Sequence, residues 1–181
     1  MNARWCVAIA GAVALAGCAE MMKDRGGSGV DGARAVALLE STKGNSAAGT
    51  VTFTQQGTRV QVNARVTGLK ANAEHGFHVH EKGDCSSGDG MSTGGHFNPS
   101  AKPHGHGGTA PEHHAGDMPN LKADANGVAS ATFSLSTISV GSGVADVVGK
   151  GLIVHRDADD YKTQPTGNAG PRLACALIRA S

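Results

Sequence analysis

The sequence predicts an all-β domain built of antiparallel strands and carrying two long loops. Glycine is abundant, at 27 of 181 residues, and aromatic residues make up only 3%, which favours short strands over a helical bundle. Residues 59–66 alternate strictly between apolar and polar side chains, as expected for an antiparallel strand with one buried face. Residues 81–120 and 156–172 are glycine-rich and lack this alternation. Loops of such length in a compact domain are usually functional or disordered.

Residues 1–17 are typical of an export signal, in which Arg4 precedes an apolar run over residues 5–16. That run is shorter than the ~20 apolar residues that a membrane-spanning helix needs. It ends in Leu15-Ala16-Gly17-Cys18, which resembles the signal of bacterial lipoproteins, where the cysteine becomes the lipidated first residue. A plain signal peptide with an incidental cysteine is the alternative. Residues 18–34 predict a flexible tether to a domain over residues 35–181.

Short alternating or wholly apolar runs divide this domain into strands. A turn at residues 124–127 (Asp-Ala-Asn-Gly) precedes one of the alternating runs. The expected strands, in chain order, are residues 35–39, 51–54, 59–66, 76–80, 129–135, 152–155 and 173–178.

The histidines are concentrated in one stretch of the chain. Histidine is the commonest metal ligand because its neutral imidazole offers a nitrogen lone pair. His78 and His80 lie two positions apart on an expected strand, so both side chains point to one face. A single buried histidine is usually only hydrogen-bonded in the core, but so dense a set favours metal binding. The nine histidines are His75, His78, His80, His96, His104, His106, His113, His114 and His155.

The charge balance does not favour nucleic-acid binding by a basic surface. Lysine and arginine number 16 and aspartate and glutamate 15, for a net charge of +1. No arrangement of serine, histidine and aspartate favours nucleophilic catalysis either. A histidine-rich loop that binds metal without turnover remains an alternative to a metalloenzyme.

Four segments of the domain resemble the copper/zinc superoxide dismutase family. The resemblance spans residues 35–178 and implies a Greek-key β-barrel or sandwich of about eight antiparallel strands. The segments are Gly76-Phe77-His78-Val79-His80-Glu81, Gly94-Gly95-His96-Phe97-Asn98-Pro99, Leu152-Ile153-Val154-His155 and Gly167-Asn168-Ala169-Gly170-Pro171-Arg172-Leu173-Ala174-Cys175.

The resemblance also implies two metal sites that share one histidine. The copper ligands would be His78, His80, His96 and His155, and the zinc ligands His96, His104, His114 and Asp117. A ligand set of imidazoles suits copper, and one that includes a carboxylate suits zinc. The spacing from His96 favours His104 over His106, and the spacing to Asp117 favours His114 over His113. Substitution by His106 or His113 stays open.

Further roles follow from the same resemblance. Asp159 would hydrogen-bond a copper ligand and a zinc ligand together, which fixes the orientation of both rings. Arg172 would guide the anion to copper, with Thr166 at the rim of the channel; Lys162 is a weaker second candidate for guidance.

The cysteines have one expected pairing. Four cysteines allow three pairings, but Cys6 would leave with the signal and Cys18 would carry lipid. The remaining two, Cys85 and Cys175, match the disulfide of the family, and cysteines of exported proteins usually pair.

The expected function is dismutation of superoxide to oxygen and hydrogen peroxide, with His96 and Arg172 as catalytic residues. A periplasmic copper- and zinc-binding lipoprotein without turnover is the alternative. The presence of His104, His114 and Asp117 argues against a copper-only enzyme. The expected location is the periplasm, with membrane attachment only through a lipid on Cys18. The oligomeric state, monomer or homodimer, stays open.

Overall fold

The computed structural model describes residue 1 and residues 30–181. The expected signal over residues 1–17, Cys18 and most of the tether therefore lie outside the described residues. Within the described part of the chain, no helix is long and apolar enough to cross a membrane.

Over residues 30–181, nine strands and one short 3-10 helix make up the regular structure, so the all-β prediction is confirmed. In chain order they are β1 (Arg34–Ser41), β2 (Ala48–Gln56), β3 (Arg59–Thr67), β4 (Glu74–His75), β5 (Phe77–His80), η1 (Met91–Thr93), β6 (Leu121–Lys122), β7 (Ala129–Leu135), β8 (Gly151–His155) and β9 (Arg172–Ala180).

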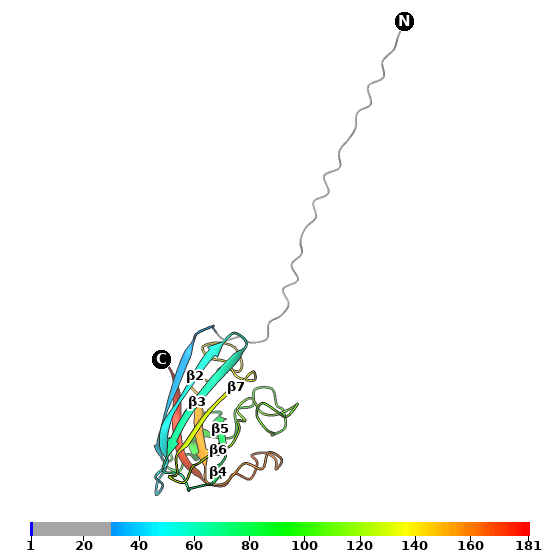
Figure 1. Cartoon of the computed structure of the whole chain (residues 1–181). Coiled ribbons are helices and arrows are strands. Elements are labelled where there is room, and N and C mark those ends of the chain that lie inside the picture. The colour runs from blue at the N-terminus through cyan, green and yellow to red at the C-terminus, as the bar shows by residue number, and fades with distance from the viewer. Residues whose placement is uncertain (2–29) are drawn as a thin grey trace.

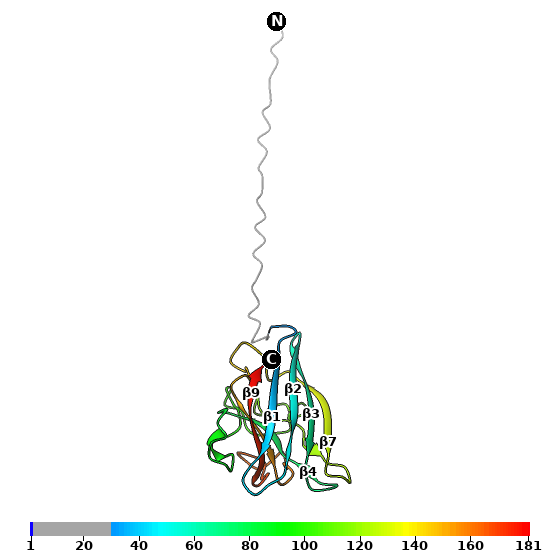
Figure 2. The same ribbon diagram turned by 90° about the vertical axis from the view of Figure 1, so that its left-hand side faces the viewer.

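Seven strands form one antiparallel sheet in the order β5-β8-β9-β1-β2-β3-β7, and β4 pairs with β6 in a small second sheet. Figure 2 shows β9, β1, β2, β3 and β7 in this order across one side of the molecule. The chain leaves the sheet after β3, crosses to β5 at the opposite end of the order and returns to β7 beside β3. Such connections are typical of Greek-key sandwiches and barrels.

The sheet curls around a single hydrophobic core. Val51 and Phe53 of β2 belong to the same buried cluster as Phe77 of β5 and Leu152 of β8, although these strands lie far apart in the strand order. Strand β3 keeps its predicted alternation, with Val60, Val62, Ala64 and Val66 buried. Strand β8 is buried along its whole length, as expected for a continuous apolar run.

The first long loop covers the free edge of β5. Val79 receives a backbone hydrogen bond from Phe97 at 2.8 Å and donates one to Gly116 at 2.9 Å. A side chain at Gly116 would overlap the carbonyl oxygen of Val79, so the close approach requires glycine here. These two hydrogen bonds hold the loop along the strand that carries His78 and His80. Figure 1 shows β5 in green, with long green loop segments beside the sheet.

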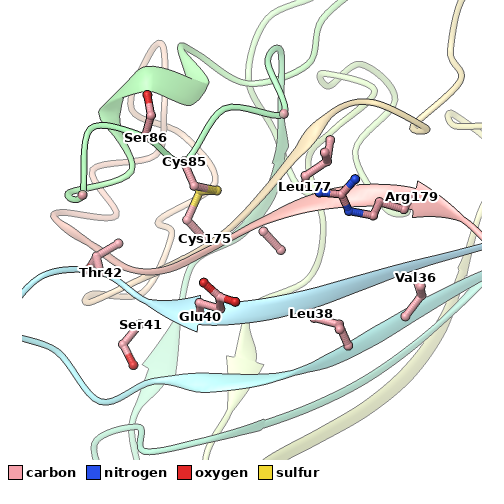
Figure 3. A pocket seen from close by; sticks show the side chains of 13 residues that line it. Val36, Leu38, Glu40, Ser41, Thr42, Cys85, Ser86, Cys175, Leu177 and Arg179 are labelled. Carbon is pink, nitrogen blue, oxygen red and sulfur yellow. A yellow bond between two sulfur atoms is a disulfide. The ribbon is translucent and has the colours of Figure 1, made fainter.

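The predicted disulfide between Cys85 and Cys175 is present, with an S–S distance of 2.05 Å. It ties the start of the first loop to β9 (Figure 3). Beside it lies a surface hollow of about 430 Å³. Val36, Leu38 and Leu177 supply apolar side chains to this hollow.

Candidate metal centre

The first group of histidines gathers where β5 and β8 meet the first loop. Strand β5 supplies His78 and His80, strand β8 supplies His155, and the loop supplies His96. One ring nitrogen from each of the four lies within 4.8 Å of all the others, and all four residues are buried. We call this set the first cluster.

Each ring of the first cluster is fixed through one nitrogen and leaves the other without a hydrogen-bond partner. Nδ1–H of His80 donates to the carbonyl of Gly94 at 2.9 Å, and Nδ1–H of His155 to Gly170 at 3.0 Å. The unpartnered atoms are Nδ1 of His78 and Nε2 of His80, His96 and His155. Buried polar atoms are rarely left unpaired. Four such nitrogens turned toward one point fit a cation that prefers imidazole, and copper is such a cation.

Burial also keeps these rings neutral. It lowers the pKa of His96 to about 4, against the opposing effect of Asp117. Burial and the nearby charge of His78 lower the pKa of His155 to about 3. Burial likewise holds the pKa values of His78 and His80 below the ordinary histidine value. At neutral pH each ring therefore carries the lone pair that a metal needs.

The second cluster surrounds the carboxylate of Asp117 and consists of His96, His104, His114 and Asp117, with ligand atoms within 4.8 Å of one another. Oδ1 of Asp117 lies 2.8 Å from Nδ1 of His96, 3.1 Å from Nδ1 of His104 and 3.3 Å from Nδ1 of His114. Its Oδ2 accepts backbone hydrogen bonds from Gly105 at 3.0 Å and His114 at 2.9 Å. Three imidazoles and one carboxylate are a donor set typical of zinc.

His96 is common to both clusters. Its Nδ1 faces Asp117, while its Nε2 has no hydrogen-bond partner and belongs to the first cluster. The rings of His96 and His78 are stacked, with centroids 3.9 Å apart. One imidazole with its two nitrogens turned to different clusters can bridge two cations once its second proton is lost.

Asp159 lies behind both clusters and is 2% exposed. Its Oδ2 accepts a hydrogen bond from Nε2–H of His78 at 2.7 Å, and its Oδ1 accepts one from Nε2–H of His104 at 2.9 Å. Burial alone would raise the pKa of Asp159, but these two imidazoles lower it well below its usual range. A side chain at Gly167 would overlap Oδ1 of Asp159, so glycine leaves room for this link.

Two loop histidines lie outside both clusters. The ring of His106 packs against Tyr161, with centroids 4.3 Å apart. Nδ1–H of His113 donates to the carbonyl of His114 at 2.7 Å, and its Nε2 accepts from the backbone of Gly108 at 3.4 Å. Both nitrogens of His113 are therefore occupied. The structure thus places His104 and His114 in the second cluster.

Sequence reasoning assigned no role to His75. This residue is fully buried, and its Nδ1–H donates to the backbone carbonyl of His155 at 2.9 Å. It therefore supports the position of a first-cluster residue. In the sequence, only its position just before β5 pointed to a role. A histidine that simply packs in the core could occupy the same position.

Arg172 begins β9 beside the first cluster and is half-buried. Nη1 donates to the carbonyl of Gly90 at 2.6 Å and to Oγ1 of Thr93 at 2.7 Å, while Nη2 donates to the carbonyl of Gly94 at 2.7 Å. Gly94 also accepts from His80, so the guanidinium and a first-cluster ring share one carbonyl. Thr166 lies half-buried in the second loop, and Lys162 is exposed there.

Comparisons with known proteins agree with this geometry. The family model described as copper/zinc superoxide dismutase matches residues 47–178. A curated relative, "Superoxide dismutase [Cu-Zn]" of Paramecium bursaria Chlorella virus 1, is 39% identical over 150 residues, which cover 80% of this chain and 76% of that protein. The crystal structure of the clock protein EA4 superposes with a TM-score of 0.76 at 40% identity and covers 84% of this chain and 97% of that one.

Proposed function

The chain belongs to the copper/zinc superoxide dismutase family and dismutes superoxide with copper and zinc. We propose that the first cluster binds the copper ion and the second cluster binds the zinc ion. Copper would be held by His78, His80, His96 and His155, and zinc by His96, His104, His114 and Asp117. The observation that carries this proposal is the ring of His96, whose two nitrogens face different clusters.

The overall reaction converts two superoxide ions and two protons into one molecule of oxygen and one of hydrogen peroxide. When bound, copper supplies the reversible one-electron exchange, and zinc supplies a fixed positive charge that polarises His96. The chain's own residues orient the site. Asp159 holds the rings of His78 and His104 through its two oxygens. His96 can hold a proton at Nε2 during half of the cycle and donate it to the departing peroxide.

We assign attraction of the anion to Arg172. A guanidinium has five N–H donors, and three of those of Arg172 are used on the first loop. Those bonds fix the group beside the first cluster and leave donors for superoxide. Because the whole chain carries a net charge of only +1, attraction has to come from local charge of this kind. Thr166 would lie at the rim of the same channel.

Superoxide turnover by the metal-loaded domain over residues 35–181, called the mature domain below, tests the assignment, with copper and zinc counted per chain. His104→Ala should lose zinc, whereas His106→Ala and His113→Ala should retain it. These two matched controls remove loop histidines that lie outside both clusters. Loss of zinc from a control variant and retention by His104→Ala would mean that the loop ligands are assigned wrongly.

We also propose export to the periplasm and attachment to a bacterial membrane through a lipid on Cys18. The sequence pattern around Cys18 supports lipidation, and the Cys85–Cys175 disulfide supports an oxidising compartment. Cys18→Ser should release the protein from the membrane fraction without affecting turnover. If Cys18→Ser distributes between the membrane and soluble fractions as the parent protein does, the segment is an ordinary signal peptide or an uncleaved anchor.

A homodimer is the remaining proposal for a partner. The hollow beside the disulfide supports it, because Leu38 there is 64% exposed and adjoins Val36 and Leu177. Sedimentation should show a dimer for the mature domain. The Leu38→Glu variant should dimerise more weakly, because it places a charge in the interface. A single monomeric species for both proteins would contradict it.

A further inference from the structure

The side chain of Gln164, in the second loop, binds both backbone polar groups of His104 in the first loop. Oε1 of Gln164 accepts a hydrogen bond from the N–H of His104 at 2.8 Å, and Nε2 donates to the carbonyl of His104 at 3.0 Å. The amide thus pairs with one residue as a neighbouring strand would. Only this orientation of the amide satisfies both bonds, because the flipped amide would place its NH2 group against the N–H of His104 and its oxygen against the carbonyl.

Asn120 makes the same contact in the opposite direction. It lies at the end of the first loop and binds both backbone polar groups of Asp159 in the second. Oδ1 of Asn120 accepts from the N–H of Asp159 at 3.0 Å, and Nδ2 donates to the carbonyl of Asp159 at 3.0 Å. Each loop therefore contributes one side-chain amide that binds the backbone of the other loop.

The two clamped residues are the pair that links the loops directly. Nε2–H of His104 donates to Oδ1 of Asp159 at 2.9 Å, and both side chains are buried. Tyr161 reinforces the arrangement, since its N–H donates to Oδ1 of Asp159 at 2.7 Å and its hydroxyl accepts from the backbone of Asn120 at 2.7 Å. Tyr161 adopts a φ of 59°, which is uncommon for a residue with a side chain. None of these contacts requires a metal.

We propose that Gln164 and Asn120 are positioning residues that hold the two loops in register, so that His104 and Asp159 are in place before zinc binds. The proposal rests on the assignment of zinc to the second cluster. Ordering long loops has an entropic cost. If the amides order the loops during folding, the free energy of zinc binding does not include this entropic cost. Zinc then binds more tightly and leaves more slowly.

Hydrogen exchange in the metal-free mature domain tests the clamps without using any metal. The amide of His104 should exchange about 3- to 10-fold faster in Gln164→Ala, since each lost hydrogen bond contributes modestly to stability. The amide of Asp159 should respond in the same way to Asn120→Ala. The amide of Val79, bonded to Gly116, reports on the body of the domain and should keep its rate. Unchanged rates at His104 and Asp159 in both variants would overturn the proposal.

Zinc release separates positioning from a general effect on folding. Gln164→Ala and Asn120→Ala should each release zinc to a chelator roughly 10-fold faster, in the range expected for groups that orient metal ligands. With Co²⁺ in place of zinc, their visible spectra should change, because the spectrum follows ligand geometry. Gln56→Ala, which removes an exposed side-chain amide that donates to Gln61, is the matched control and should behave as the parent protein.

A clamp variant that melts earlier but releases zinc at the parent rate would show a structural role only and would overturn the proposal. Failure of the zinc assignment gives a different result, namely a His104→Ala variant that retains zinc at full stoichiometry. Hydrogen exchange in the metal-free protein does not depend on which residues bind zinc. Failure of the clamp proposal and failure of the zinc assignment are therefore distinguishable.

Discussion

Nδ1 of His96 lies 2.8 Å from Oδ1 of Asp117, while Nε2 of the same ring faces the first cluster without a hydrogen-bond partner. Asp117 thus fixes the orientation of the one ring that the two clusters share. Behind it, Asp159 joins His78 of the first cluster to His104 of the second. The two clusters are therefore connected twice, once through an imidazole and once through a carboxylate.

Asp159→Asn should weaken zinc binding by about 10- to 100-fold, the range typical of groups that orient metal ligands. An amide cannot accept hydrogen bonds through both of its terminal atoms, so one of the two rings loses its anchor. Competition with a chelator of known affinity measures the effect. Asp160→Asn, an exposed neighbour, is the control. Equal zinc affinity for Asp159→Asn and the parent protein would show that the carboxylate does not orient His104.

The metal-free protein should be most stable near pH 6.5, because the pKa of a histidine in the unfolded chain is about 6.5. Burial lowers the pKa of His96 to about 4 and of His155 to about 3. The stability from these neutral rings is present above about pH 6.5 and is lost as the pH falls toward those values. His104 behaves oppositely, because Asp117 and Asp159 outweigh burial and raise its pKa to about 9. Its contribution is complete below about pH 6.5 and is lost as the pH rises through 9.

Denaturant unfolding of the metal-free domain between pH 4 and 9 measures this profile. His104→Ala should remove the decline on the alkaline side and keep the decline on the acid side. Stability that rose steadily from pH 6.5 to 9 in the parent protein would contradict the interpretation of His104.

Replacing Cys85 and Cys175 together by serine should lower the free energy of unfolding by up to about 4–5 kcal/mol, because the bridge closes a loop with a sequence separation of 90. Denaturant midpoints of the oxidised parent and the double variant give the difference. The native protein should also show no free thiol at either position. Two alkylatable thiols in that protein would contradict the disulfide.

Arg172→Ala should reduce the rate roughly 10-fold or more with both metals bound, and the remaining activity should depend less on salt, since screening acts over ~10 Å at 0.1 M. Arg172→Lys keeps the charge but not the three hydrogen bonds to the first loop, and it should retain more activity. Rates over a range of salt concentrations, with metal content measured in parallel, test both variants. Full activity and the parent's salt dependence in Arg172→Ala would remove Arg172 from the mechanism.

Much of the sheet could be predicted because its strands carry local signals. The alternation of residues 59–66 falls within β3, and the apolar run of residues 152–154 falls within β8. The two-residue strands β4 and β6 were not predicted, since pairs this short have no periodicity. The pairing of Ala35 with Ala180 joins the two ends of the domain. No local pattern specifies such a contact, and only the family resemblance indicated the barrel.

The candidate site was predictable where histidine itself was the signal. The amides of Asn120 and Gln164 carried no such signal, because asparagine and glutamine are common in exposed loops. Their importance depends on the backbone groups of His104 and Asp159 that the fold brings opposite them. The same holds for His75, whose partner is a backbone carbonyl on another strand.

The most direct test of the account is the metal content and superoxide turnover of His96→Ala in the mature domain, measured on the same sample. Because one ring faces both clusters, we expect loss of most turnover together with loss of zinc and a changed copper spectrum. Zinc retained at full stoichiometry would contradict the claim that His96 serves both metals.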